Sequence, residues 1–252
     1  MDLARFTERA RRFLRDGAAA TVNSAIVNER VLQSYAAFVA PGDLAFDVGA
    51  NVGDRTAALR ELGARVVAVE PQPACLARLD AQFGADPAVS IVRAAAAAEP
   101  GSYEIWLNES DTISSMSSEW MEAVKRSGRF GAAEWNRSVT VAGTTLDALI
   151  EEHGVPAFCK IDVEGFEPEV LAGLSRPIPA VSFEYVGEVP ERSVRCVERL
   201  ASLGPYEFVL STGIERRGER WESAEEAIAR LRSLPNQLDT GDVYARLRPN
   251  PA

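Results

Sequence analysis

Short, almost continuous apolar runs alternate with segments of helical periodicity along most of the chain. The runs at residues 44–48 and 65–70 are typical of strands in a parallel sheet, because such a sheet is covered on both faces. Between them, residues 56–62 have a helical pattern that ends at Gly63, and glycine is common just after helices. A strand, a helix and a second strand in this order predict a βαβ unit.

The same alternation continues through the rest of the sequence. It predicts further strands at residues 89–93, 157–162, 181–185, 207–210 and 243–247. It predicts further helices at residues 73–82, 146–152, 167–174, 190–203 and 223–234. Strands that alternate with helices in this way favour an α/β fold with a doubly wound, mostly parallel sheet. In such a fold, ligands bind beyond the carboxyl ends of the strands, where the strand order reverses.

An N-terminal region precedes this alternation. Helical patterns at residues 3–15 and 24–38 predict a helical cap over residues 1–40, followed by a single domain at residues 41–252.

Residues 103–142 interrupt the alternation as an insertion. We expect paired strands at residues 103–108 and 138–142, with a polar, flexible segment at residues 109–137 between them. This segment is nevertheless rich in bulky apolar side chains, namely Met116, Trp120, Met121, Phe130 and Trp135. We interpret the insertion as a lid over a substrate. A satellite hydrophobic cluster and a contact between subunits are the alternatives.

The amino-acid composition and the net charge disfavour several classes of protein. Of the 252 residues, 46% are hydrophobic and 25% are charged, which is typical of a globular protein with a sizeable core. The formal net charge of −10 argues against a nucleic-acid partner and against a basic membrane-binding surface. The charged N-terminal start and the lack of any long apolar stretch lead us to expect a cytoplasmic protein with no membrane partner.

The cysteine and histidine content limits the chemistry. The three cysteines lack the spacing of a zinc site, and their odd number disfavours a disulfide framework. The single histidine, His153, precedes a glycine at a predicted helix end, where it is expected to interact with the helix dipole. Asp147 is expected to be a structural residue in a first helical turn after a threonine cap. Triads with histidine and multi-histidine metal sites are therefore disfavoured.

A glycine-rich turn, DVGANVG at residues 47–53, follows the first strand. Glycine and asparagine tolerate the left-handed backbone region, so this turn can approach a ligand closely. A dinucleotide fingerprint would place glycines where Asn51 and Asp54 stand, so a pyrophosphate ligand is disfavoured. Asp47 and Asp54 instead favour a cationic ligand without phosphates.

Glu70 ends the second strand. A carboxylate at this place can accept hydrogen bonds from both hydroxyls of a ribose, and Pro71 and Pro73 stiffen the turn that holds it. The structural alternative is a solvated glutamate at a strand end. S-Adenosylmethionine, whose sulfonium is cationic and which has a ribose but no phosphate, meets these conditions.

A second group of charged residues stands in KIDVEGFE at residues 160–167. Lys160 and Asp162 point to the same side of a strand, and Glu164 follows them at its carboxyl end. These groups are candidates to deprotonate or orient a methyl acceptor, alone or through Mg²⁺ held by Asp162 and Glu184. The structural alternative is an ion pair of Lys160 with Asp162 or Glu184, with Glu167 capping the next helix.

These motifs together resemble the FkbM-type methyltransferases. The resemblance is carried in order by DVGANVG at 47–53, VEPQP at 69–73, TTLD at 144–147, KIDVEGFE at 160–167 and SFE at 182–184. It implies a class I, Rossmann-like fold with a seven-stranded sheet that uses S-adenosylmethionine. It also implies methyl transfer to a hydroxyl of a sugar, a polyketide or another secondary metabolite.

The resemblance implies roles for individual residues. Asp47, Gly49, Asn51 and Gly53 are expected to hold the methionine part of the cofactor and Glu70 its ribose, and residues 160–164 are expected to face the acceptor. The full predicted cofactor-binding set is Asp47, Gly49, Ala50, Asn51, Gly53, Glu70, Pro71 and Ala94. The predicted catalytic residues are Lys160, Asp162 and Glu164, and the predicted ligands of an optional Mg²⁺ are Asp162 and Glu184.

Three hypotheses for function follow. The first is an O-methyltransferase that acts on a hydroxylated small molecule. The second is a cofactor-binding fold without catalysis that serves in assembly, with the tryptophan-rich segment as the contact of a homodimer. The third is a nicotinamide-dependent oxidoreductase, which the missing glycines disfavour.

Overall fold

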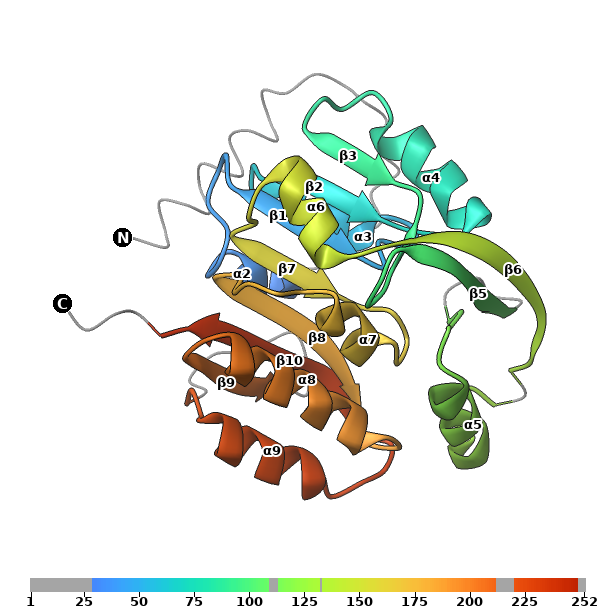
Figure 1. Ribbon diagram of the computed structural model, residues 1–252, viewed down its shortest axis with the longest axis vertical. Helices are drawn as coiled ribbons and strands as arrows, with labels where there is room; N and C mark the ends of the chain where they lie inside the picture. The colour runs from blue at the N-terminus through green and yellow to red at the C-terminus, as the bar shows by residue number, and fades with distance from the viewer. Residues whose placement is uncertain (1–28, 109–112, 132, 212–219, 249–252) are drawn as a thin grey trace.

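A computed structural model describes residues 29–108, 113–131, 133–211 and 220–248 (Figure 1). The expected helix at residues 3–15 and most of the expected N-terminal cap lie outside these residues. The described part of the cap contains helix α2 (Glu29–Tyr35).

The main sheet has seven strands in the order β3-β2-β1-β7-β8-β10-β9. Their bounds are β1 Leu44–Val48, β2 Arg65–Val69, β3 Val89–Val92, β7 Phe158–Ile161, β8 Ala180–Val186, β9 Tyr206–Ser211 and β10 Thr240–Leu247. Strand β10 runs antiparallel to β8 and β9, and the other neighbouring strands are parallel. The predicted α/β fold with a mostly parallel, seven-stranded sheet is confirmed.

The strand order reverses between β1 and β7. From β1 the chain moves outward through β2 to β3, and it then returns to place β7 on the other side of β1. In register, Asp47 of β1 lies opposite Lys160 of β7. The carboxyl ends of these strands are therefore the edge at which a ligand is expected.

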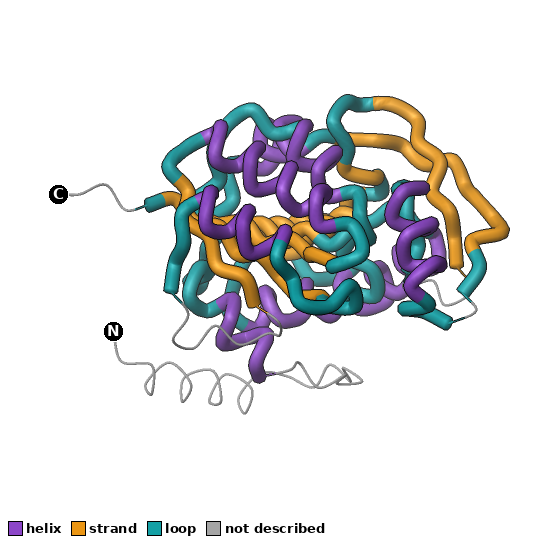
Figure 2. Tube along the Cα trace, turned by 90° about the horizontal axis from the view of Figure 1, so that it is seen from below, coloured by secondary structure: helices purple, strands orange, loops and turns teal. Residues whose placement is uncertain are grey.

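Helices cover both faces of the main sheet (Figures 1 and 2). One face packs against α2, α3 and α4, and the other against α6, α7, α8 and α9. Their bounds are α3 Asp54–Glu61, α4 Pro73–Phe83, α6 Leu146–His153, α7 Glu167–Ala172, α8 Pro190–Leu203 and α9 Ala224–Arg232. None of these described helices combines the length and the apolar character that a membrane crossing requires.

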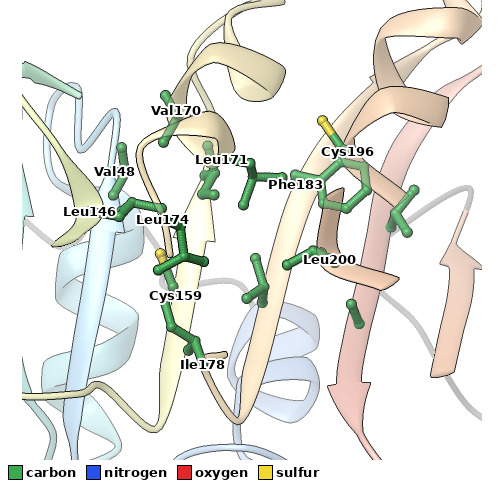
Figure 3. Packing of buried hydrophobic residues seen from close by; sticks show 14 of the residues in the cluster. Val48, Leu146, Cys159, Val170, Leu171, Leu174, Ile178, Phe183, Cys196 and Leu200 are labelled. Atoms are coloured by element: carbon green, nitrogen blue, oxygen red, sulfur yellow. The ribbon is translucent and has the colours of Figure 1, made fainter. Parts of the chain in front are cut away.

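The larger hydrophobic core lies between the sheet and helices α6 to α9. Figure 3 shows its dense centre, where Leu146, Val170 and Leu200 from three helices meet Cys159 and Phe183 from β7 and β8. All five side chains have a relative exposure of 0%. Burial of this kind explains why the strands read as almost continuous apolar runs in the sequence.

The insertion forms a second, three-stranded sheet in the order β4-β6-β5. Strands β5 (Gly101–Asn108) and β6 (Trp135–Thr144) pair antiparallel, as the sequence predicts. Strand β4 (Ala95–Ala96) lies within a run of alanines at residues 94–98 and pairs in parallel with the end of β6. The sequence analysis did not anticipate this strand. This pairing anchors the insertion beside the edge of the main sheet.

The expectation that residues 109–137 form a flexible segment is wrong for its described part. Helix α5 (Ser118–Ser127) begins at Ser117, whose side chain accepts a hydrogen bond from the backbone N–H of Trp120. Trp120 is fully buried and packs with Trp135 and Val186 in a hydrophobic cluster of its own. The sequence analysis missed this helix because most of its residues are polar. The buried side chains of this helix form a satellite hydrophobic cluster, which is one of the alternatives considered for the segment. Trp120 has no exposed surface with which it could contact a partner.

Gly165, in the loop after β7, supports this cluster. Its φ of 87° lies in the left-handed region, and a Cβ atom at this position would overlap the indole of Trp120. Gly128, at the end of α5, has a similar φ of 73°, but a Cβ atom there would meet nothing within 4 Å. The two glycines thus share a backbone conformation and differ in their surroundings.

We predict that Gly165→Ala lowers the free energy of unfolding by about 2–4 kcal/mol, because backbone strain and overpacking add together. Gly128→Ala is the matched control and should cost only about 1–2 kcal/mol, since it adds strain alone. Urea denaturation of both variants and the wild type measures the difference. An equal loss for the two variants would contradict the close packing of Trp120 on Gly165.

Candidate functional site

A cleft of about 300 Å³ lies at the carboxyl ends of β1, β2 and β7. It is bounded by the turn after β1, the end of β2, the alanines around β4, and the loop after β7. Side chains from the insertion, Ile105, Ser114 and Met116, close another side. The cleft therefore sits where the strand order reverses, the place at which α/β sheets bind ligands.

The turn after β1 is fixed from both sides. The backbone N–H groups of Gly49 and Ala50 donate to the carbonyl of Val69 on β2, at 2.9 and 3.0 Å. Gly49 has a φ of 82°, and a Cβ atom there would overlap the carbonyl of Asp162 after β7. Asn51 also adopts the left-handed region, with a φ of 48°. The backbone of this turn therefore lies directly on the cleft.

Glu70 forms the wall of the cleft at the end of β2. Its Oε2 accepts a hydrogen bond from the N–H of Asn51, and its Oε1 accepts one from the N–H of Gln72, both at 2.8 Å. The side chain is only 2% exposed, and this burial raises the pKa of Glu70 to about 7 against the opposing effect of the two N–H groups. Each oxygen keeps a further lone pair with which it can accept a hydrogen bond from a ligand.

Most of the predicted cofactor-binding residues line the cleft. These are Gly49, Ala50, Asn51, Glu70, Pro71 and Ala94. Asp47 and Gly53 do not line it. Asp47 is fully buried and accepts a hydrogen bond from the Thr56 hydroxyl at 2.5 Å, and burial raises its pKa to about 6. Gly53 lies against Phe83 and Leu79 of α4. Both residues therefore support the turn from behind.

Lys160 is fully buried below the cleft. Its Nζ donates to Asp242 of β10 at 2.6 Å and lies 3.5 Å from a carboxylate oxygen of Asp162. Burial alone would lower the pKa of Lys160, but the carboxylates of Asp162 and Asp242 outweigh it and hold the pKa well above its ordinary value. The ammonium group therefore stays charged. The expected pair with Asp162 is present, and among the described residues no ion pair joins Lys160 to Glu184.

Three carboxylates lie close together near the carboxyl ends of β7 and β8. Asp162, Glu164 and Glu184 can each bring one oxygen within 4.8 Å of the other two. Asp162 and Glu164 line the cleft, and Glu164 adopts a left-handed φ of 52°. Burial and the neighbouring carboxylates raise the pKa values of Glu164 and Glu184 well above the ordinary value. A cluster of this kind can hold a divalent cation through its oxygen ligands.

Several neighbouring residues have structural roles. Glu167 accepts hydrogen bonds from the N–H groups of Val163 and Gly165, at 3.1 and 3.2 Å, so it holds the loop before its own helix. His153 stands in the last turn of α6, and Thr145 caps the first turn of that helix, as the sequence predicts. Asp147 accepts a hydrogen bond from the N–H of Ser175 at 2.9 Å, which agrees with a structural role.

Two important residues were missed by the sequence analysis. Asp242 lies on an antiparallel strand 82 residues after Lys160, and only the topology brings the two together. Arg55 lines the cleft from the first turn of α3. A signal for Arg55 did exist, because it follows the glycine-rich turn by two positions and stands in the first turn of the next helix.

The sequence model of a family described as "Methyltransferase FkbM domain" matches residues 47–198. No curated protein matches the chain at a significant level.

Solved structures provide distant similarities. A precorrin-6y C5,15-methyltransferase from Geobacter metallireducens has 12% sequence identity and a TM-score of 0.48, over 93% of this chain and 94% of that chain. A TehB-like SAM-dependent methyltransferase from Corynebacterium glutamicum has 10% identity and a TM-score of 0.45, over 97% of each chain. These similarities concern the arrangement of the elements and not their chemistry.

The family match covers more than half of the chain. It also contains every residue that lines the cleft. The protein therefore belongs to the FkbM methyltransferase domain family.

Proposed function

We propose that this protein transfers a methyl group from S-adenosylmethionine to a hydroxyl oxygen of a small molecule, such as a sugar, a polyketide or another secondary metabolite. The observation that carries the proposal is Glu70, a buried carboxylate fixed by two backbone N–H groups at the wall of the cleft. Its free lone pairs suit the two hydroxyls of a ribose. The membership in a methyltransferase family supports the reaction type.

The charge of the cleft suits this cofactor. Four acidic residues, Asp54, Glu70, Asp162 and Glu164, line it together with one basic residue, Arg55. When bound, S-adenosylmethionine supplies an electrophilic methyl group on a positively charged sulfur. The backbone of Gly49 and Asn51 would contact the cofactor between the ribose and the methionine part. Pro71 and Ala94 would line the wall beside the ribose, while Asp47 and Gly53 hold the turn.

Asp162 and Glu164 are the groups that we assign to the acceptor. Both line the cleft, so a hydroxyl bound there can donate its proton to one of these carboxylates. Lys160 stays protonated and orients Asp162, so its role is positioning and electrostatic rather than that of a base. Correct placement of two reactants can supply about 7–11 kcal/mol of the rate acceleration.

A divalent cation is an optional part of the proposal. Asp162, Glu164 and Glu184 form an oxygen donor set of the kind that Mg²⁺ accepts, since Mg²⁺ needs few protein ligands and keeps several waters. In that position a cation would neutralise the crowded carboxylates and hold the acceptor oxygen.

We predict that Glu70→Gln weakens the binding of S-adenosylmethionine, because charged hydrogen bonds to the ribose are each worth about 1.5–3 kcal/mol. Isothermal titration calorimetry measures the dissociation constant. Asp80→Asn is the control, since Asp80 is an exposed carboxylate on α4 that pairs with Arg93 away from the cleft. Equal affinity in Glu70→Gln and the wild type would contradict the assignment of Glu70. If the wild-type protein binds no S-adenosylmethionine at millimolar cofactor concentration, the proposed function itself is contradicted.

The binding of S-adenosylmethionine should also depend on pH. The pKa of Glu70 is raised to about 7, so its carboxylate becomes ionised, and a better acceptor, as pH rises. We expect the affinity to increase between about pH 6 and pH 8, and the part due to Glu70 to be absent in Glu70→Gln. Calorimetric measurements of both proteins across this pH range distinguish the ionisation of Glu70 from the ionisation of the ligand itself. Parallel pH profiles for the two proteins would contradict the prediction.

Glu164→Gln should lower turnover about 10²- to 10⁴-fold, the usual contribution of a general base, while leaving cofactor affinity close to that of the wild type. Transfer of a labelled methyl group to a panel of hydroxylated metabolites, with mass spectrometry of the product, measures both rate and site. Glu99→Gln, an exposed glutamate before β5, is the control. Duplicate reactions with EDTA test the cation. Unchanged turnover in Glu164→Gln, or a methyl group on nitrogen, would contradict the assignment.

A further inference from the structure

Arg55 stands in the first turn of α3, the helix that follows β1 and the glycine-rich turn. It is half-buried and lines the same cleft as Asn51, Glu70 and Asp162. Within the described part of the chain, its guanidinium makes neither a hydrogen bond nor an ion pair within 4 Å. Its N–H groups are therefore available to donate hydrogen bonds to an anionic group of a ligand in the cleft.

The acidic groups nearest to Arg55 are already engaged. Asp242 and Asp162 flank the ammonium group of Lys160, and Asp47 accepts the hydrogen bond of Thr56. These carboxylates nevertheless act on Arg55 at longer range. Burial would lower the pKa of Arg55, but Tyr35, Asp162 and Asp242 outweigh it and keep the pKa above its ordinary value. The guanidinium is therefore a permanent positive charge on the cleft wall.

The other charges of the cleft wall determine what this cation can bind. Arg55 is the single basic residue among the described lining residues, whereas the charged residues elsewhere on the wall, Asp54, Glu70, Asp162 and Glu164, are acidic. An anionic group of any ligand in the cleft is thus directed to Arg55. Glu70, at the end of β2, is the place for a ribose. The carboxylates that act on Arg55 at longer range include Asp162, just after β7, and Asp242 on β10, and both strands lie on the other side of β1 from β2.

S-Adenosylmethionine has the matching charge distribution. Beyond its ribose and sulfur it ends in an amino acid group, which carries one carboxylate and one ammonium. With the ribose at Glu70, this end of the molecule extends across β1 toward β7. Resting on the proposed function, we infer that the guanidinium of Arg55 binds the carboxylate of the methionine part of the cofactor. Arg55 thereby selects ligands that retain this carboxylate.

The test compares S-adenosylmethionine with decarboxylated S-adenosylmethionine, which keeps the sulfonium and the amine. Dissociation constants are measured by calorimetry for the wild type, Arg55→Gln, Arg55→Lys and the control Arg65→Gln. Arg65 is exposed at the amino end of β2, so its replacement changes the net charge equally but lies away from the cleft. The readout is the ratio of the two dissociation constants for each protein.

We expect the wild type and Arg65→Gln to prefer the intact cofactor about 10- to 100-fold, the range of a charge-assisted pair. Arg55→Gln should reduce this ratio to near one by weakening the binding of the intact cofactor alone. Arg55→Lys should retain part of the preference. An unchanged ratio in Arg55→Gln overturns the inference while leaving the proposed function intact. Loss of both ligands in Arg55→Gln also overturns it, because the effect is then not specific to the carboxylate. A wild type that binds neither ligand overturns the proposed function as well.

Discussion

The buried ammonium group of Lys160 is the constraint on which the ligand edge of this fold depends. A charge in the centre of a parallel sheet is stable only with close counter-charges, and here Asp242 and Asp162 provide them. Asp242 comes from β10 and Asp162 from the end of β7. The pairing therefore connects the antiparallel part of the sheet with the loop that carries Glu164. It also leaves a net negative charge at the mouth of the cleft, which favours a cationic ligand.

The insertion supports this same loop from the other side. Ser115 donates a hydrogen bond to the carbonyl of Glu164 at 2.6 Å, and Trp120 packs on Gly165. Arg192 of α8 donates to the carbonyl of Gly165 and pairs with Glu119 of α5 at 2.7 Å. The loop that carries Glu164 is thus held by contacts with α5, with α8 and with the segment before α5. The insertion contributes to the position of an acidic side chain in addition to closing the cleft.

The sequence predicts the main sheet well because its strands are buried on both faces, which leaves a clear apolar signature in runs such as RVVAV at β2. It also predicts the ligand edge, since Gly49, Asn51 and Glu70 carry local signals. It assigns Asp47 to the cofactor, whereas the structure buries Asp47 outside the lining of the cleft, because a sequence pattern cannot distinguish a buried acid that supports a turn from one that lines a cleft. The pairing of Asp242 with Lys160 depends on the insertion of β10 beside β8, which no local pattern indicates. Helix α5 was missed because its apolar face is narrow and its flanks are rich in serine.

The 82 residues between Lys160 and Asp242 have a consequence for the order in which the molecule is assembled. During synthesis, β1, β2 and β7 emerge well before β10, so the glycine-rich turn and Glu70 can be in place first. Until β10 inserts between β8 and β9, the ammonium group of Lys160 lacks its nearest counter-charge, and its burial is unfavourable. The insertion of β10 therefore completes the charge balance of Lys160 at a late stage, after the strands that carry the glycine-rich turn and Glu70 have been synthesised.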